Sequence, residues 1–134
     1  MTPIEQLYYA LGEVAYAIAK ADGTIQKEEK EKLQSILETE FRVHKPGFEI
    51  TEIIFQILQK DETDSKTAYD WALKAMRLNS QYISENLKQH FINVIKKVAA
   101  AFPPTTSAER EYIDDFIYQL KSIKGDSVFS YETE

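Results

Sequence analysis

The sequence predicts an all-α fold: a bundle of six to seven helices with a pseudo-two-fold repeat of a helix-turn-helix pair. Apolar residues recur at the three- and four-residue spacing of helices in successive segments of the chain. The 134 residues include only four glycines and four prolines, too few for the turns of a hairpin-rich β fold. We expect one helical domain over residues 1–124, followed by a short polar tail, residues 125–134.

The first helix is expected to begin at Pro3. Thr2 suits the N-cap, Pro3 suits the first helical position, and Glu5 completes a capping box. Gly12 and the neighbouring alanines indicate a close helix crossing, and Gly23 is expected to end the helix. The apolar face follows helical spacing: Ile4, Leu7, Tyr8, Leu11, Val14, Ala15 and Ile18.

Two further helices are expected in the first half of the chain. The second runs from about residue 26 to 40, before a connection at 42–47 in which Pro46-Gly47 acts as the breaker. The third, at about 48–59, is apolar on most sides and is predicted to be the buried centre of the domain. A strand is the alternative for this β-branched segment, but nothing nearby would pair with it. The inward residues of the two helices are Leu33, Ile36, Leu37, Phe41, Ile50, Ile53, Ile54, Phe55, Ile57 and Leu58.

A fourth helix follows the acidic residues 61–64. Asp64 or Ser65 caps it, and it ends near Leu78. Residues 79–83 are expected to form a turn or a short helical bridge. The inward residues of the fourth helix are Ala68, Trp71, Ala72, Ala75 and Leu78.

The fifth and sixth helices complete the bundle. Ser84 caps the fifth, which covers about 85–101. Residues 106–109 form a second capping box, which opens a sixth helix that ends at Gly125. The inward residues are Leu87, Phe91, Val94, Ile95, Val98, Ile113, Phe116, Ile117, Leu120 and Ile123. The outward residues of the sixth helix are Arg110, Glu111, Asp114 and Asp115.

The segment at 14–37 is echoed 80 positions later in the chain; for example, Glu29 falls on Glu109. This repeat predicts two helix-turn-helix pairs that pack around the middle helices. The copies differ at the turn, which reads Asp-Gly-Thr at 22–24 and Phe-Pro-Pro at 102–104. Only the first turn therefore carries an acidic side chain.

Composition and charge exclude several classes of protein. The formal net charge is −6, whereas a protein that binds nucleic-acid phosphates needs a basic face, so no nucleic-acid partner is expected. The absence of cysteine excludes thiolate metal sites and disulfides and fits a cytoplasmic location. Glu5 and Glu13 interrupt the first apolar segment, and no segment approaches the ~20 apolar residues of a spanning helix. We therefore expect no secretory signal and no membrane insertion.

Catalytic and cofactor-binding residues are not expected. His44 lies in a polar connection, and His90, beside the inward Phe91, is typical of a histidine at the core boundary. Neither has a serine and carboxylate at a spacing that indicates nucleophilic catalysis. The sequence thus predicts a non-enzymatic protein.

Acidic residues and a turn coincide at one place, Asp22-Gly23-Thr24-Ile25 followed by Glu28-Glu29. With Asp22 at the fifth position of a calcium-binding EF-hand loop, Thr24 supplies the backbone carbonyl and Glu29 takes the bidentate twelfth position. The first and third positions would be Ile18 and Lys20, which cannot bind calcium, so a complete EF-hand is excluded.

Two interpretations of this turn stay open. In the first, Asp22, the Thr24 carbonyl and Glu29, with Glu28 as a further candidate, hold a weakly bound divalent cation, calcium or magnesium, whose shell water completes. In the second, the turn is structural: Gly23 is a left-handed helix C-cap, Asp22 makes a local hydrogen bond, and Ile25 packs back onto the bundle. Glu28 and Glu29 then lie at a helix N-terminus, where the helix dipole favours them.

The residues around this turn, 17–25 with Glu28-Glu29, resemble the TerB-like family of small helical tellurite-resistance proteins of bacteria. The same fold occurs as the N-terminal domain of a membrane-bound J-domain co-chaperone, but this chain has no His-Pro-Asp tripeptide, so the free-standing cytosolic form is the closer analogue. The resemblance covers about residues 7–120. It implies six to seven helices, divalent cations bound near the turns, and a role in stress response or tellurite resistance.

Carried over residue by residue, the resemblance supports Asp22 and Glu29 as metal ligands, with Glu28 less closely matched. The second copy of the motif has lost its Asp-Gly pair at 102–104. An unidentified protein partner is expected, and the oligomeric state stays open. The alternative function is a helical protein-interaction module that binds its partner through an exposed groove or through the tail aromatics.

Overall fold

The computed structural model is all-α in the residues that it describes, which are 1–21, 25, 27–40, 45–101 and 107–123. For residues 29, 37, 40 and 45–48 only the backbone is described. Within these ranges, six α-helices and one short 3₁₀ helix confirm the predicted fold class. The helices are α1 (Pro3–Lys20), α2 (Lys27–Glu40), α3 (Lys45–Lys60), α4 (Ser65–Leu78), η1 (Ser80–Tyr82), α5 (Glu85–Ala100) and α6 (Ser107–Ser122).

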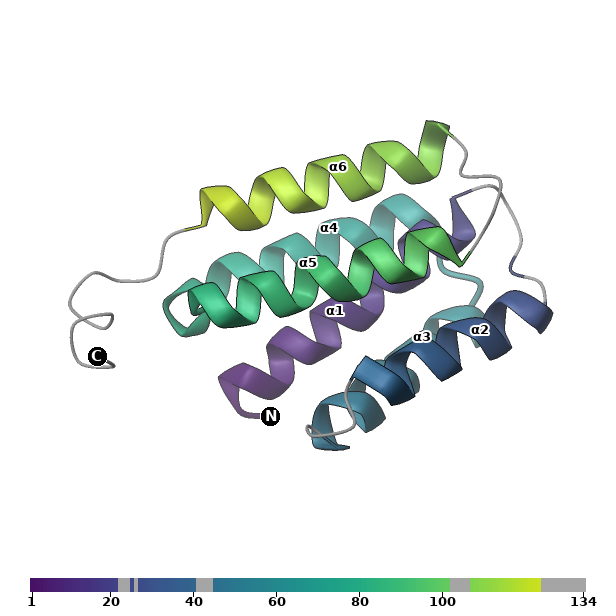
Figure 1. Cartoon of the computed structure of the whole chain (residues 1–134), viewed down its shortest axis with the longest axis horizontal. Helices are drawn as coiled ribbons and strands as arrows, with labels where there is room; N and C mark the ends of the chain where they lie inside the picture. Colours follow the sequence, from purple (N-terminus) through teal and green to yellow (C-terminus); the bar gives the residue numbers. More distant parts are fainter. Residues whose placement is uncertain (22–24, 26, 41–44, 102–106, 124–134) are drawn as a thin grey trace.

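Helix α1 is the buried centre of the bundle. Every residue from Ala10 to Ala19 is buried, and α1 contacts α3, α4, α5 and α6. In Figure 1, α4, α5 and α6 lie on one side of α1, and α2 with α3 on the other. The prediction that the third helix is the centre is wrong, since Ile53 and Ile57 of α3 are 55% and 45% exposed. Alanines make α1 thin enough for neighbours to pack around it, which the bulky α3 does not allow.

Gly12 allows α1 and α3 to cross closely, as the sequence predicted. A Cβ atom at this position would lie 2.2 Å from Ile54 Cγ2 and 2.8 Å from the Thr51 carbonyl oxygen. Beside the crossing, the Thr51 hydroxyl donates a 3.1 Å hydrogen bond to the Tyr8 carbonyl of α1. The missing side chain therefore sets the distance between the two helices.

The predicted starts of α1, α4 and α5 are confirmed, whereas Thr106, which opens the capping box predicted for α6, lies outside the described residues. The Thr2 hydroxyl accepts a hydrogen bond from the Glu5 backbone, and the Glu5 carboxylate accepts one from the Thr2 backbone. The side chains of Asp64 and Ser84 cap α4 and α5 by accepting a hydrogen bond from the backbone N–H of Thr67 and of Leu87. The exception is Pro46-Gly47, predicted as a breaker, which lies inside the first turn of α3. Proline is tolerated there because the first backbone N–H groups of a helix have no partner within it.

The inward face of α4 differs from its prediction. Trp71 and Leu78 are 50% and 74% exposed, whereas Tyr69 and Met76 are buried. Ala68 and Ala72 are buried as expected, so the true face is rotated away from Trp71. The predicted bridge after α4 is the 3₁₀ helix η1, and the cores of α5 and α6 follow prediction with Phe91, Val94, Ile95, Val98, Ile113, Phe116 and Leu120 buried.

The contacts between helices agree in part with the expected two-fold repeat. A two-fold exchange of the α1–α2 pair with the α5–α6 pair would relate the α1–α6 contact to the α2–α5 contact, and both occur. However, α5 packs on α6, whereas α1 and α2 share no comparable contact in the described part of the chain.

No helix in the described ranges has the length and apolar character that crossing a membrane requires.

A candidate binding groove between helices α4 and α6

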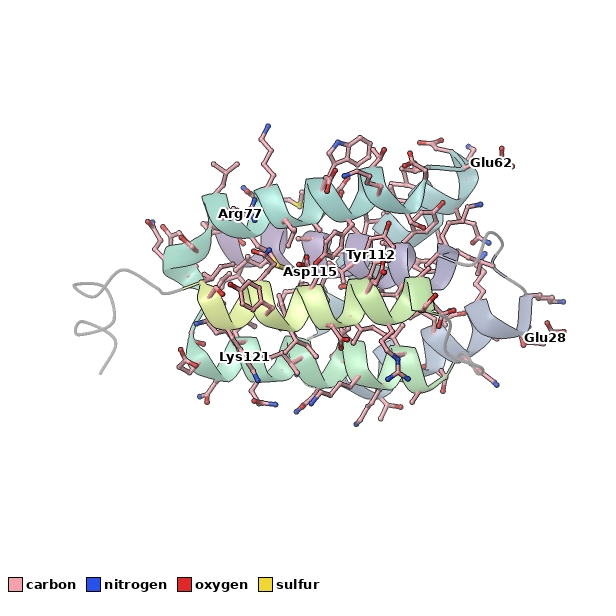
Figure 2. The ribbon with its side chains drawn as sticks, turned by 90° about the horizontal axis from the view of Figure 1, so that it is seen from above. Glu28, Glu62, Arg77, Tyr112, Asp115 and Lys121 are labelled. Atoms are coloured by element: carbon pink, nitrogen blue, oxygen red, sulfur yellow. The ribbon has the colours of Figure 1, made fainter. Side chains whose placement is uncertain are left out.

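The residues predicted to bind metal are described only in part. Asp22, Gly23 and Thr24 lie outside the described residues, and so does the side chain of Glu29. Glu28 is exposed at the start of α2, and Figure 2 shows it well apart from Tyr112 and Asp115 of α6. Among the side chains that are described, no group of three or more histidines and carboxylates is arranged to hold a metal ion. The metal site therefore stays a prediction.

One feature of the turn agrees with the structural interpretation. Ile25 is half-buried and packs against the hydrophobic core. It shares a hollow of about 230 Å³ with Tyr16 and Lys20 of α1 and with Gln59 and Glu62 near the end of α3. The Tyr16 hydroxyl donates a 2.5 Å hydrogen bond to the Thr63 carbonyl beside this hollow. Ile25 thus contributes apolar contact after α1 ends, whether or not the turn binds a cation.

On the other side of the α1 terminus, a groove of about 430 Å³ runs between α4 and α6. This volume lies within the range of small-molecule and peptide sites. Ala21, the last described residue before the Asp-Gly turn, lines the groove together with residues of α6. The groove is lined by Ala21, Ser65, Lys66, Tyr69, Asp70, Leu73, Ala108, Glu111, Tyr112 and Asp115.

Two tyrosine rings form the inner surface of this α4–α6 groove. The rings of Tyr69 and Tyr112 lie 4.9 Å apart at an angle of 59°, a separation typical of aromatic pairs in protein cores. Tyr69 is buried and Tyr112 is half-buried, and both residues line the groove. Figure 2 shows Tyr112 and Asp115 on the side of α6 that faces α4.

Asp115 holds the Tyr69 hydroxyl. Tyr69 donates a hydrogen bond to Asp115 Oδ2 across the two helices. Burial, and then this hydrogen bond, raise the pKa of the Tyr69 hydroxyl, so it remains a donor at neutral pH. The sequence predicted Asp115 as an outward, solvated residue, and this prediction is wrong: Asp115 is half-buried because Tyr69 reaches it from α4.

Carboxylates outnumber cations around the groove. Asp70, Glu111 and Asp115 supply three negative charges, whereas Lys66 supplies one positive charge. Lys66 Nζ lies 3.0 Å from Asp70 Oδ2, and this hydrogen bond raises the pKa of the lysine. Both partners of that pair are exposed, so solvent weakens their attraction.

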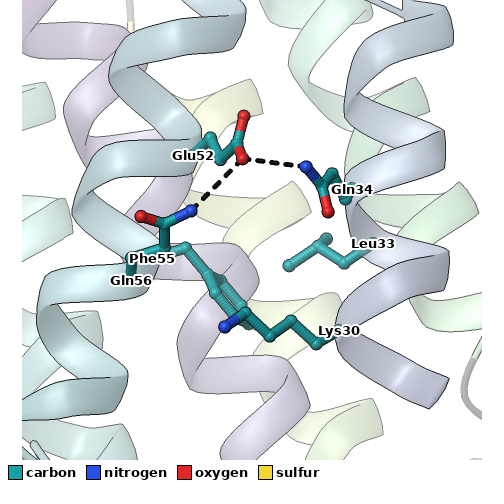
Figure 3. A pocket seen from close by; sticks show the side chains of 6 residues that line it. All are labelled: Lys30, Leu33, Gln34, Glu52, Phe55 and Gln56. Atoms are coloured by element: carbon teal, nitrogen blue, oxygen red, sulfur yellow. Dashed lines mark hydrogen bonds between the residues drawn. The ribbon is translucent and has the colours of Figure 1, made fainter. Parts of the chain in front are cut away.

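Two other hollows are smaller, at about 20 and 310 Å³. Figure 3 shows one between α2 and α3, where Gln34 and Gln56 donate hydrogen bonds of 3.0 and 3.2 Å to Glu52. Its volume of about 20 Å³ has room for a single water molecule. Another, near the start of α1, includes the half-buried His90, whose ring lies 6.2 Å from that of Phe91, as expected for a boundary histidine. His44 lies outside the described residues.

A buried acid was missed by sequence reasoning. Glu13 of α1 is only 3% exposed, and burial raises the pKa of its carboxyl from 4.5 to about 8. The neutral form of this buried carboxyl is therefore favoured at neutral pH. The interruption of an apolar run by one glutamate was its only signal in the sequence, and that pattern equally fits an exposed residue.

Comparisons of the chain with protein-family models, with curated proteins and with solved structures gave no match. The resemblance to the TerB-like family therefore stays a prediction that rests on the residues around the Asp-Gly turn.

Proposed function

We propose that the chain is a non-enzymatic binding module, and that the α4–α6 groove receives a segment of a protein partner. The observation that carries the proposal is the half-buried Tyr112, which lines a groove of about 430 Å³ with its ring held against that of Tyr69. Tyrosine is enriched where proteins meet because its ring offers a large contact area and its hydroxyl a hydrogen bond.

The walls of the groove are held in place by contacts within the bundle. The Tyr69 side chain is fixed by its hydrogen bond to Asp115, and both α4 and α6 pack against the central α1. A ligand therefore loses little free energy in ordering the site, which favours binding. The expected roles in stress response or tellurite resistance would be carried out through such a partner.

Selection from a displayed peptide library tests the proposal. Peptides selected on the wild-type protein should lose most of their affinity for Tyr112→Ala. They should keep their affinity for Tyr118→Ala, because Tyr118 lies on the same helix but is 67% exposed and does not line the groove. If no peptide is selected, or if the selected peptides bind Tyr112→Ala as tightly as the wild type, the groove is not a binding site.

A second candidate function is a weak calcium or magnesium site at the Asp-Gly turn. The position of Ala21 favours it, since the residue before Asp22 shares the groove with Glu111 and Asp115. Carboxylates close to a site strengthen the binding of hard cations. In this second proposal, Asp22, the Thr24 carbonyl and Glu29 bind the ion, and Glu28 is a further candidate ligand.

Titration with calcium and magnesium, followed by amide chemical shifts, tests this second candidate. Residues 20–30 should respond at millimolar metal in the wild type and should lose the response in Asp22→Asn. The exposed Asp61→Asn is the matched control and should behave as the wild type. The metal site is contradicted if residues 20–30 do not respond at millimolar concentration.

A further inference from the structure

We infer that the ligand of the α4–α6 groove is a short basic segment of a partner protein, in which a lysine or arginine side chain lies against Tyr112 and pairs with Glu111. This inference rests on the proposed binding module and names the chemistry of its partner. It follows from the charge, the aromatic surface and the length of the groove.

The charges of the groove favour a cation. Asp115 accepts the hydrogen bond of Tyr69, and Asp70 is paired with Lys66. Glu111, on the exposed side, makes no hydrogen bond or ion pair with another described residue. An acidic segment would bring like charges together here, whereas a lysine or arginine gives Glu111 a partner.

The aromatic surface favours the same chemistry. Glu111 and Tyr112 are consecutive residues of α6, and both line the groove. An ammonium or guanidinium group placed over the tyrosine ring is attracted by the negative charge of the ring face. Because both residues line the groove, a basic side chain that lies against Tyr112 is also close to the negative charge of Glu111.

The length of the groove favours a peptide over a single small cation. Its α4 wall extends from Ser65 to Leu73, eight positions, which is about 12 Å of helix. A segment of three to four extended residues covers roughly the same distance. A free polyamine in so open a groove would remain largely hydrated, whereas a peptide backbone also covers Leu73 and Ala108.

Lys66 competes with the incoming cation. It is exposed and pairs with Asp70 at the edge of the groove, in the position that a basic segment would approach. Removal of its charge should therefore tighten the binding of a basic peptide. This gain in affinity is useful as a test because a variant that fails to fold cannot produce it.

Isothermal titration of the whole chain with a capped peptide of alternating glycine and arginine tests the inference. Glu111→Gln should weaken binding about two- to fivefold, and Lys66→Gln should strengthen it about twofold. Asp114→Asn removes the same charge from the exposed neighbour of Asp115, outside the groove, and should leave the affinity unchanged. A peptide of alternating glycine and glutamine should bind at least about tenfold more weakly than the arginine peptide.

Four results would overturn the inference. Equal weakening by Asp114→Asn and Glu111→Gln would show attraction to the net negative charge alone. Equal binding of the glutamine peptide would remove the role of the cation, and spermidine that binds as tightly as the arginine peptide would remove the role of the peptide. If library peptides depend on Tyr112 but carry no basic residue, the binding module stands and this inference fails.

Discussion

The phenolic hydroxyl of Tyr69 donates a hydrogen bond to the Asp115 carboxylate and so joins α4 to α6 across the inner wall of the groove. The two residues are 46 positions apart in the sequence. Tyr112 lies one helical turn before Asp115, and its ring is held against that of Tyr69. A single contact between helices thus fixes both the aromatic surface and one of the acidic groups of the groove.

Tyr69→Phe should destabilise the fold modestly and leave Asp115 without its donor. Because the acceptor is charged and only half-buried, we expect a loss of about 1–2 kcal/mol in the free energy of unfolding, measured by urea denaturation. Tyr118→Phe, on the exposed side of α6, is the control and should change stability by less than about 0.5 kcal/mol. Equal effects of the two substitutions would show that the hydrogen bond does not join the helices.

Gly12→Ala should destabilise the protein although alanine favours helices. The new Cβ would meet Ile54 Cγ2 at 2.2 Å and the Thr51 carbonyl at 2.8 Å, so α1 and α3 must separate. Such overpacking costs about 1–3 kcal/mol and outweighs the gain of about 1 kcal/mol in helix propensity. Ile54→Ala in the same chain should recover part of the loss, seen as coupling in a double-mutant cycle. A stabilising Gly12→Ala would contradict the close crossing.

Glu13 makes stability depend on pH. Its carboxyl has a pKa of 4.5 in an unfolded chain and of about 8 in the folded protein, because burial disfavours the charged form. Between these values the folded state binds more protons than the unfolded state. The free energy of unfolding therefore falls as pH rises, by up to about 1.4 kcal/mol per pH unit, and levels off above the folded pKa.

Glu13→Gln isolates this effect because the other carboxylates are common to both proteins. Urea unfolding between about pH 5 and pH 8 should show the wild type losing stability relative to Glu13→Gln as the pH rises. Glu31→Gln, exposed on α2, should run parallel to the wild type. Parallel curves for the wild type and Glu13→Gln would mean that Glu13 is ionised in the folded state.

Two residues of α4 provide a direct test of the rotated face. Met76→Ala should cost about 2–5 kcal/mol because it leaves a cavity at a fully buried position. Trp71→Ala should cost less than about 1 kcal/mol, since half of that side chain already faces solvent. Urea unfolding followed by circular dichroism measures both without relying on Trp71 as the probe. The reverse order would restore the face that the sequence predicted.

Local signals in the sequence predicted the fold well. Capping residues such as Thr2, Asp64 and Ser84 act on the backbone within three positions, so their effect can be read without the tertiary structure. The same holds for the small residues of α1, including Gly12. The choice of the central helix was predicted wrongly because both α1 and α3 are apolar, and the prediction followed the bulky apolar residues of α3 rather than the small residues of α1.

The α4–α6 groove could not be predicted from local patterns in the sequence. Tyr69 and Asp115 lie on different helices, and nothing in either helix predicts that they meet. The Lys66–Asp70 pair, by contrast, lies within one helix at the four-residue spacing of a helix face. The sequence predicts a site at the Asp-Gly turn, and Ala21, the residue before that turn, lines the groove.

Intermolecular nuclear Overhauser effects between the arginine peptide and the protein test the central claim most directly. The side-chain protons of arginine should show contacts with the ring protons of Tyr112, because the cation is expected to lie over that ring and beside Glu111. Tyr118 and Trp71 are exposed aromatic residues outside the groove and provide the internal comparison. Contacts to Tyr112 alone would agree with the proposed site, whereas contacts to Tyr118 or Trp71 without Tyr112 would contradict it.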